Sequence, residues 1–189
     1  MNSSVAELIE KLDHEVKICT KCDLHKSRTI AVPGDGSTNT PLLFIGEAPG
    51  KQEDLEGRPF VGAAGRLLSQ LLSSVGLSRE GIYITNIVKC RPPENRPPHT
   101  KEIVACSNYL ERQMKLIKPK IICPMGNIAL RSLLRKDTSI SKAHGQPFPY
   151  AESHLIFPLY HPAAALYVAK LRTVLEEDFQ KLSKLLESN

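Results

Sequence analysis

Three segments of the sequence could bind and polarise a small ligand. The segment GEAPG (46–50) is rich in small residues, which let backbone amides approach a carbonyl or an anion closely. Asn86 offers one hydrogen-bond acceptor and two donors, and His161 precedes Pro162 at a position where a helix would begin. Helix amides and the helix dipole disfavour an imidazolium there, so we expect His161 to be a neutral hydrogen-bond donor.

Each of these features also has a purely structural explanation. GEAPG could be an ordinary phosphate-binding turn, Asn86 could cap a turn, and a single histidine at a helix start usually serves as a cap. Neither GxGxxG nor GxxxxGK[ST] occurs in the sequence, which counts against nucleotide binding. The residue types alone therefore leave the activity open.

The five cysteines are the second chemical feature. Cys19 and Cys22 form a CxxC pair, whereas Cys90 and Cys106 lie far along the chain. A tight pair and two distant thiolates can enclose one tetrahedral site for either a zinc ion or a 4Fe-4S cluster. Alternatively, Cys90 and Cys106 are ordinary buried thiols. We assign Cys123, inside the apolar run IICPM, to the core.

Four short apolar runs predict the strands that position these residues, at 42–45, 82–85, 121–123 and 155–159. Between and beyond them, helical spacing of apolar residues predicts helices at about 3–17, 67–75, 103–117, 128–134 and 162–187. Alternating strands and helices predict a three-layer α/β/α sandwich with a central, mainly parallel four-stranded sheet. Ligands bind beyond the carboxyl ends of such strands, so the three segments should converge at one edge.

Composition limits the class of protein. The 189 residues suit a single domain (1–189), and no repeat or low-complexity tract divides them. No apolar run approaches the roughly 20 residues that span a bilayer, and the N-terminal residues read as an amphipathic helix and not as a secretory signal. We therefore expect a cytoplasmic protein with no membrane association, in which the cysteines bind metal in preference to forming disulfides.

The net charge of +5 is compatible with nucleic acid, and part of it is concentrated in one stretch. Residues 89–101 contain four basic side chains and one acidic side chain, Glu94; the basic residues are Lys89, Arg91, Arg96 and Lys101. We interpret this stretch as an irregular loop that phosphates could reach.

Longer motifs resemble a known family. The stretch FIGEAPGKQEDLEGRPFVGAAGRLL, with TNIVKCRPPENRPP and YHPAAAL, resembles the family 4 uracil-DNA glycosylases of the uracil-DNA glycosylase superfamily. The resemblance runs from about residue 10 to residue 175. It implies a prokaryotic, monofunctional enzyme that hydrolyses the N-glycosidic bond of uracil in DNA and leaves an abasic site for base excision repair. It also implies a structural 4Fe-4S cluster on Cys19, Cys22, Cys90 and Cys106.

The same resemblance assigns roles in uracil binding. An extruded uracil would stack on Phe60, pair its O4 and N3–H with the carboxamide of Asn86, and direct O2 at His161. His161 would stabilise the negative charge that grows on O2 as the bond breaks. Spacing alone would instead place Phe60 in the core, and Asn86 in a turn.

Acidic residues and the backbone would complete this pocket. A sister family has an aspartate in the matching loop where this chain has Ala48, so the neighbouring Glu47 is the second catalytic candidate, to orient water or stabilise the sugar cation. Glu53 would wall off the C5 side of the base against the methyl group of thymine. Backbone groups of Gly46, Glu47 and Ala48 would line the remainder.

The expected partner is uracil-containing DNA, single- or double-stranded, with a base extruded at a cost of a few kcal/mol. Arg91 and Arg96, in the proline-stiffened loop RPPENRPPH, should reach phosphates. Leu166 should enter the gap left by the flipped base, although it would fit a helix core equally well. We expect a monomer, with a sliding clamp as a candidate protein partner.

Three alternatives fit the sequence less well. A related glycosylase family traps uracil covalently through a histidine in an extended basic loop, but CRPPENRPPHT has no such insertion. A zinc nucleobase deaminase needs HxE and PCxxC, and neither occurs. The third is a catalytically inactive iron–sulphur DNA-binding module. The presence of Phe60, Asn86 and His161 together argues against it.

Overall fold

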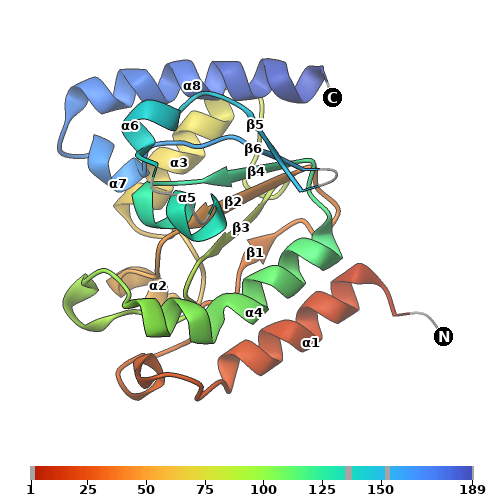
Figure 1. Ribbon diagram of the computed structural model, residues 1–189, viewed down its shortest axis with the longest axis vertical. Coiled ribbons are helices and arrows are strands. Elements are labelled where there is room, and N and C mark those ends of the chain that lie inside the picture. Colours follow the sequence, from red (N-terminus) through yellow and green to blue (C-terminus); the bar gives the residue numbers. More distant parts are fainter. Residues whose placement is uncertain (1–2, 135–137, 152–153, 189) are drawn as a thin grey trace.

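A six-stranded sheet forms the centre of the molecule, in a computed structural model that describes residues 3–134, 138–151 and 154–188 (Figure 1). The strand order is β1-β3-β2-β4-β6-β5. The four central strands are parallel, and each edge strand pairs antiparallel with its neighbour. The strands are β1 (Asp35–Gly36), β2 (Leu42–Gly46), β3 (Tyr83–Asn86), β4 (Ile121–Pro124), β5 (Phe148–Tyr150) and β6 (His154–Ile156).

The predicted sandwich with a mainly parallel sheet is confirmed, but the sheet is wider than the four strands predicted. β1 and β5 are only two and three residues long, and neither contains an apolar run. Both lie at sheet edges, where proline and charged residues are tolerated because one side of the strand needs no partner. The last predicted strand is shorter than expected, since beyond Ile156 only an isolated bridge at Leu159 continues the pairing.

Helices cover both faces of the sheet, giving three layers (Figure 1). α1, α4 and α5 lie on one face, and α3 and α8 lie on the other. The helices are α1 (Val5–Lys17), α2 (Lys51–Glu56), α3 (Ala63–Ser74), α4 (Thr100–Ile117), α5 (Asn127–Leu134), α6 (Ile140–Ala143), α7 (Pro162–Ala165) and α8 (Ala169–Glu187). No helix of the described residues is long and apolar enough to cross a bilayer.

Alternation along the central strands divides the core in two. In β2, Leu43 and Ile45 pack with the side chains of α1 and α4, whereas Leu42 and Phe44 pack with those of α3 and α8. Strands buried on both faces read as continuous apolar runs, which is why the sequence reveals them. Cys123 lies in the second core and is fully buried, as predicted.

The C-terminal helical region is interrupted where the sequence suggested helix throughout 162–187. α7 ends at Ala165, and α8 begins after Val168, whose backbone is extended. The intervening Leu166, Tyr167 and Val168 are exposed apolar residues, and Tyr167 is 89% exposed. Leu166 is therefore a surface residue and not part of a helix core.

Candidate active site and cysteine cavity

A cleft of about 420 Å³ opens at the carboxyl edge of the parallel strands, where the three segments GEAPG, Asn86 and His161 converge. We call it the carboxyl-edge cleft. β2 and β3 pair in parallel up to Gly46 and Asn86, so the two segments that follow them emerge side by side. Of the residues predicted from sequence, it is lined by Glu47, Ala48, Glu53, Phe60, Asn86, Arg96 and His161.

Gly46 lies directly beneath the side chains of Asn86 and Phe60. A side chain at this position would overlap the carboxamide oxygen of Asn86 and come within 2.8 Å of the ring of Phe60. Both side chains therefore lie directly over the glycine, and no larger residue fits beneath them. The Gly46 carbonyl already accepts from the amide of Ile87 (2.9 Å), and contact of a Gly46 backbone group with the base stays a prediction.

Phe60 is held in an uncommon backbone conformation. Its φ of 52° lies in the left-handed region, which costs a non-glycine residue roughly 1–2 kcal/mol. Arg79 stabilises it by donating from Nη1 to the Phe60 carbonyl (2.8 Å) and from Nη2 to the carbonyl of Pro59. Gly65, in α3, leaves room for the same carbonyl. These contacts hold the backbone that carries the Phe60 ring.

Asn86 carries an unsatisfied polar atom into the cleft. The residue is 2% exposed, and its Oδ1 has no hydrogen-bond partner among the described residues. Leaving a buried acceptor unpaired costs about 1–3 kcal/mol. An atom of this kind at the wall of a cleft is typical of a group that a ligand satisfies.

His161 stacks on Phe60 in the wall of the cleft, with ring centroids 5.5 Å apart and an angle of 28° between the planes. It is the N-cap of α7, and the amide of Ala163 donates to its Nδ1 (3.1 Å). Nδ1 must therefore be unprotonated, which places the proton on Nε2. Burial lowers the pKa of His161 to about 4, and Glu53 opposes this shift. At neutral pH the side chain is a neutral Nε2–H donor.

The two acidic residues of the cleft differ in what they contact. Glu47 is half-buried, and burial raises the pKa of its carboxyl group. Glu53 accepts at Oε2 from the amide of Gly50 (3.1 Å) and at Oε1 from those of Val61 (3.0 Å) and Gly62 (2.9 Å). Glu53 thus bridges the two loops that border Phe60, whereas no such contact engages the carboxylate of Glu47 within the described chain.

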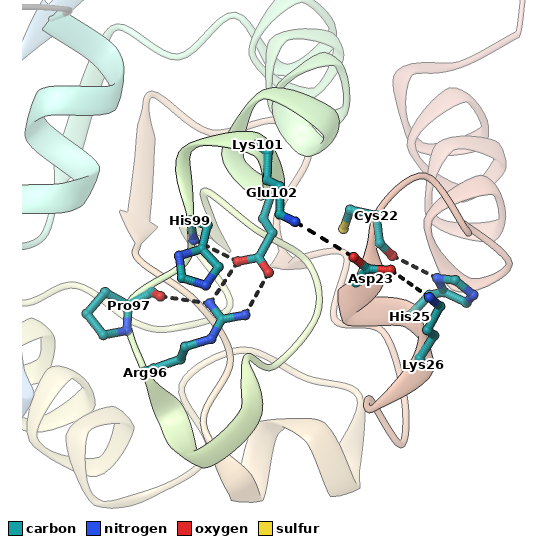
Figure 2. Close-up of polar contacts among 9 residues, drawn as sticks. All are labelled: Cys22, Asp23, His25, Lys26, Arg96, Pro97, His99, Lys101 and Glu102. Atoms are coloured by element: carbon teal, nitrogen blue, oxygen red, sulfur yellow. Dashed lines mark hydrogen bonds and ion pairs between the residues drawn. The ribbon is translucent and has the colours of Figure 1, made fainter.

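The basic stretch is less available to phosphates than its composition suggested. Lys89 is buried, and Arg96 donates from both terminal nitrogens to Glu102 at 2.9 and 2.7 Å (Figure 2). Lys101 lies 3.9 Å from Asp23. These side chains instead tie the loop and the start of α4 to the rest of the fold. Phosphate contact by Arg96 stays a prediction.

Arg91, by contrast, lies at the surface of the loop near the cleft. Its Nε donates to the side chain of Asn95 (2.7 Å), a cleft residue that the sequence reasoning missed. Asn95 and Glu94 both have a positive φ, so the loop turns sharply at the rim. Loop residues of this kind carry no periodic pattern, so nothing in the sequence points to them.

The four predicted ligand cysteines line a second, smaller cavity, which we call the cysteine cavity. Cys19 and Cys22 follow α1, Cys90 follows β3, and Cys106 lies in α4. Arg28 donates to the sulphur of Cys90 (3.1 Å), and the backbone amide of Lys21 donates to the sulphur of Cys19 (3.5 Å). In the described residues, no three His, Cys, Asp or Glu side chains are arranged to hold a single metal ion.

Polar contacts order the segment that carries Cys22, and one exposed ion pair links it to the start of α4 (Figure 2). The carbonyl of Cys22 lies 2.7 Å from Nδ1 of His25, and Asp23 accepts from Lys26 at 2.7 Å while facing Lys101. Sequence-distant cysteines are therefore brought to one place by the packing of α1, α4 and the continuation of β3. CxxC spacing could predict only the first two.

Comparison with known proteins agrees with this geometry. A family model described as the uracil DNA glycosylase superfamily matches residues 33–185. The chain is 50% identical over 185 residues to the type-4 uracil-DNA glycosylase of Sulfurisphaera tokodaii, covering 94% of this chain and 84% of that protein. It is 43% identical to the type-4 enzyme of Archaeoglobus fulgidus, covering 95% and 94%, and 41% identical to that of Thermotoga maritima, covering 96% of both. With this fold, this cleft and this extent of similarity, the chain belongs to the type-4 uracil-DNA glycosylases of the uracil-DNA glycosylase superfamily.

Proposed function

We propose that the protein hydrolyses the N-glycosidic bond between uracil and deoxyribose in DNA and leaves an abasic site for base excision repair. The observation that carries this proposal is the buried, unpaired Oδ1 of Asn86 in the wall of a cleft that Phe60 and His161 also line. The cleft thus offers an acceptor, an aromatic face and a neutral donor. This set matches the edge and face of an extruded uracil.

Recognition of the base follows from Asn86 and Phe60. Oδ1 would accept from N3–H of uracil, and the amide nitrogen would donate to O4. Cytosine reverses both positions, so each mismatch would leave a buried group unpaired at a cost of about 1–3 kcal/mol. Stacking on Phe60 would add about 1–3 kcal/mol without distinguishing between bases.

Catalysis would depend on His161. As the glycosidic bond breaks, negative charge moves into the uracil ring, and Nε2–H of a neutral imidazole can donate to O2 where that charge accumulates. Because the amide of Ala163 occupies Nδ1, the donor direction is set before the substrate arrives. His161 would therefore act by electrostatic stabilisation of the leaving group and not by transferring a proton to it.

Water attack falls to Glu47 in this proposal. Its carboxylate borders the cleft on the segment after β2 and is not engaged by the loop contacts that occupy Glu53. It can orient a water molecule toward the sugar or stabilise the positive charge that forms there. Glu53 would act through the loops that it bridges, forming the wall near C5 that excludes the methyl group of thymine.

DNA would be held around the mouth of the cleft. Arg91 on the loop and Leu166 after α7 are both accessible, and α7 begins directly after its N-cap, His161. Leu166 would fill the gap left by the extruded base, and Arg91 would contact phosphate. Non-specific backbone contacts of this kind weaken as salt increases.

The cysteine cavity fits a 4Fe-4S cluster held by Cys19, Cys22, Cys90 and Cys106. Its four sulphurs are soft donors, and one of them accepts a charged hydrogen bond from Arg28, a contact that suits a thiolate. In such a cluster each cysteine binds a different iron, so the sulphurs need not meet at the single point that one ion demands. When bound, the cluster would supply a structural cross-link between the N-terminal segment, β3 and α4.

The decisive experiment measures base release. Purified protein is incubated with duplex and single-stranded DNA containing one uracil, with a thymine-containing strand as control, and free uracil and abasic sites are quantified. We expect both products from uracil DNA only. Binding without release of uracil would instead establish the inactive DNA-binding module.

Asn86→Asp tests recognition in the same assay. The aspartate side chain replaces the amide donor with an acceptor, so uracil excision should fall by roughly 10- to 100-fold, equivalent to about 1–3 kcal/mol. Cytosine excision should become detectable by release of free cytosine. Uracil excision at the parent rate would refute the role given to Asn86.

A further inference from the structure

Lys89 is a buried charge that the proposed chemistry does not use. It lies three residues after Asn86, is 1% exposed, and lines the cysteine cavity. Burying an ammonium group is costly unless its donors are satisfied, and an apolar side chain of similar volume would pack as well or better. Its contacts should therefore explain what it does.

All three donors of the ammonium are used, and they converge on the end of β3. Nζ donates to the Asn86 carbonyl (2.8 Å), to Oγ1 of Thr85 (2.5 Å) and to Oε1 of Gln113 (2.7 Å). An ammonium has three N–H groups, so no donor remains for another partner. The geometry fixes two consecutive residues of β3 to α4.

Gln113 and Thr85 are themselves anchored. The amide of Gln113 donates to the carbonyl of Pro33 (3.0 Å) and approaches the hydroxyl of Tyr83 at 3.3 Å. Thr85 donates from Oγ1 to the same Pro33 carbonyl (2.6 Å). Lys89 is thus the cationic centre of a closed polar network under the sheet, not a loose side chain.

The sheet explains why such a contact is needed at Asn86. On one side, β2 supports β3 as far as Gly46 opposite Asn86. On the other side, β1 pairs only with Tyr83 and Ile84, so it ends before reaching Asn86. No described strand pairs with Asn86 on that side, and the Asn86 carbonyl accepts from the ammonium of Lys89 instead.

We propose that Lys89 is a positioning residue for uracil recognition: by holding the Asn86 carbonyl and the Thr85 hydroxyl, it fixes the direction in which the Asn86 carboxamide enters the carboxyl-edge cleft. The proposal rests on the proposed function. Because Oδ1 of Asn86 has no protein partner, its direction depends on the backbone that carries it. Lys89 acts through that backbone and does not touch the base.

Lys89→Met is the direct test, since methionine has similar length and no donor. Affinity for free uracil, measured by calorimetry, should fall by roughly 10- to 100-fold, and the ratio of uracil to cytosine excision should fall with it. The matched control is Leu182→Ala in α8, which opens a cavity in the opposite core. It should lower the Tm and leave uracil affinity unchanged.

Three results would overturn the proposal: parent-like uracil affinity, loss of affinity equal to that of Leu182→Ala, or loss of iron and visible absorption together with affinity. The last would place the effect in the cysteine cavity instead of at Asn86. Should Lys89→Met fail to fold, Lys89→Gln carries the same comparison with the same outcomes. If the parent protein releases no uracil, the proposed function is refuted. If the parent is active and Lys89→Met binds uracil as tightly as the parent does, only the positioning role is refuted.

Discussion

The carboxyl-edge cleft and the cysteine cavity share one stretch of chain but differ in exposure and in hydrogen bonding. β3 and its continuation supply Asn86 to the first and Cys90 to the second. The cleft is open, and Asn86 leaves an acceptor unpaired in it. In the cavity, Cys90 is buried and its sulphur already accepts from Arg28. Under the proposed function, the cleft would receive a base from DNA, and the cavity would hold a permanently bound cluster.

This difference predicts that damage to the two regions can be separated. Changes in the cleft should reduce the rate of base release with little effect on unfolding. Changes in the cavity should reduce stability, because a metal centre that cross-links distant segments contributes its binding free energy to folding. The segment from Asn86 to Cys90 joins the two regions, and the loop after Cys90 returns to the cleft with Asn95 and Arg96.

The largest expected effect is in the cleft. His161→Ala removes the donor aimed at the leaving group and should lower the single-turnover rate of uracil release by about 100- to 1,000-fold. The Tm should change by only a few degrees, because the residue contributes one weak cap to a four-residue helix. A loss of less than about threefold in rate would contradict the role of His161.

The cavity should show the opposite behaviour. Cys106→Ser should remove iron and visible absorption and lower the Tm by on the order of 10 °C, from a loss of about 3 kcal/mol. Uracil release per folded molecule, assayed well below the Tm, should fall only a few-fold. Cys123→Ser is the matched control: Cys123 is equally buried but lies in the other core, so iron content should remain at the parent level.

We expect the free energy of unfolding to decrease at acid pH because of His161 in the carboxyl-edge cleft. The pKa of His161 is about 4 in the folded protein and about 6.5 when exposed, so the unfolded state binds more protons between these values. Stability is therefore complete above about pH 6.5 and falls as the pH drops toward 4, by at most about 3 kcal/mol. Denaturant titrations at pH 7 and pH 4.5 should show a smaller difference for His161→Gln than for the parent. Equal differences would mean that His161 titrates normally.

The smallest expected effect concerns the rim. Leu166→Ala should raise KM on duplex DNA by about 3- to 10-fold, because a smaller side chain fills less of the gap left by the extruded base. Single-stranded substrate has no such gap in a base stack, so its KM should be unchanged. An equal effect on both substrates would assign Leu166 to general DNA contact.

The sequence predicted the parts of the molecule that follow from repeated or short-range patterns. Apolar runs located the four parallel strands, and the rule for parallel sheets placed Asn86 and His161 at one edge. The helix start at Pro162 predicted a neutral His161, and its pKa is indeed low, but the cause is burial of the side chain and not the helix.

What the sequence could not predict depends on contacts between distant residues. Lys89 was counted with the surface charges, yet three acceptors from β3 and α4 hold it inside the fold. Its place in a basic loop predicts phosphate contact for Arg96, whereas in the fold its guanidinium pairs with Glu102. Arg79 gave no signal at all, since its role in holding Phe60 exists only in the folded chain.

The left-handed backbone of Phe60 has a consequence for how substrate is received. Its conformational penalty is offset by Arg79, so the backbone that carries the ring is held in place without any ligand. Preorganisation of this kind lowers the entropy cost of binding, because no flexible aromatic side chain has to be ordered. A flipped base would meet a finished surface, and selection would depend on whether that base fits and not on whether the protein can adapt to it.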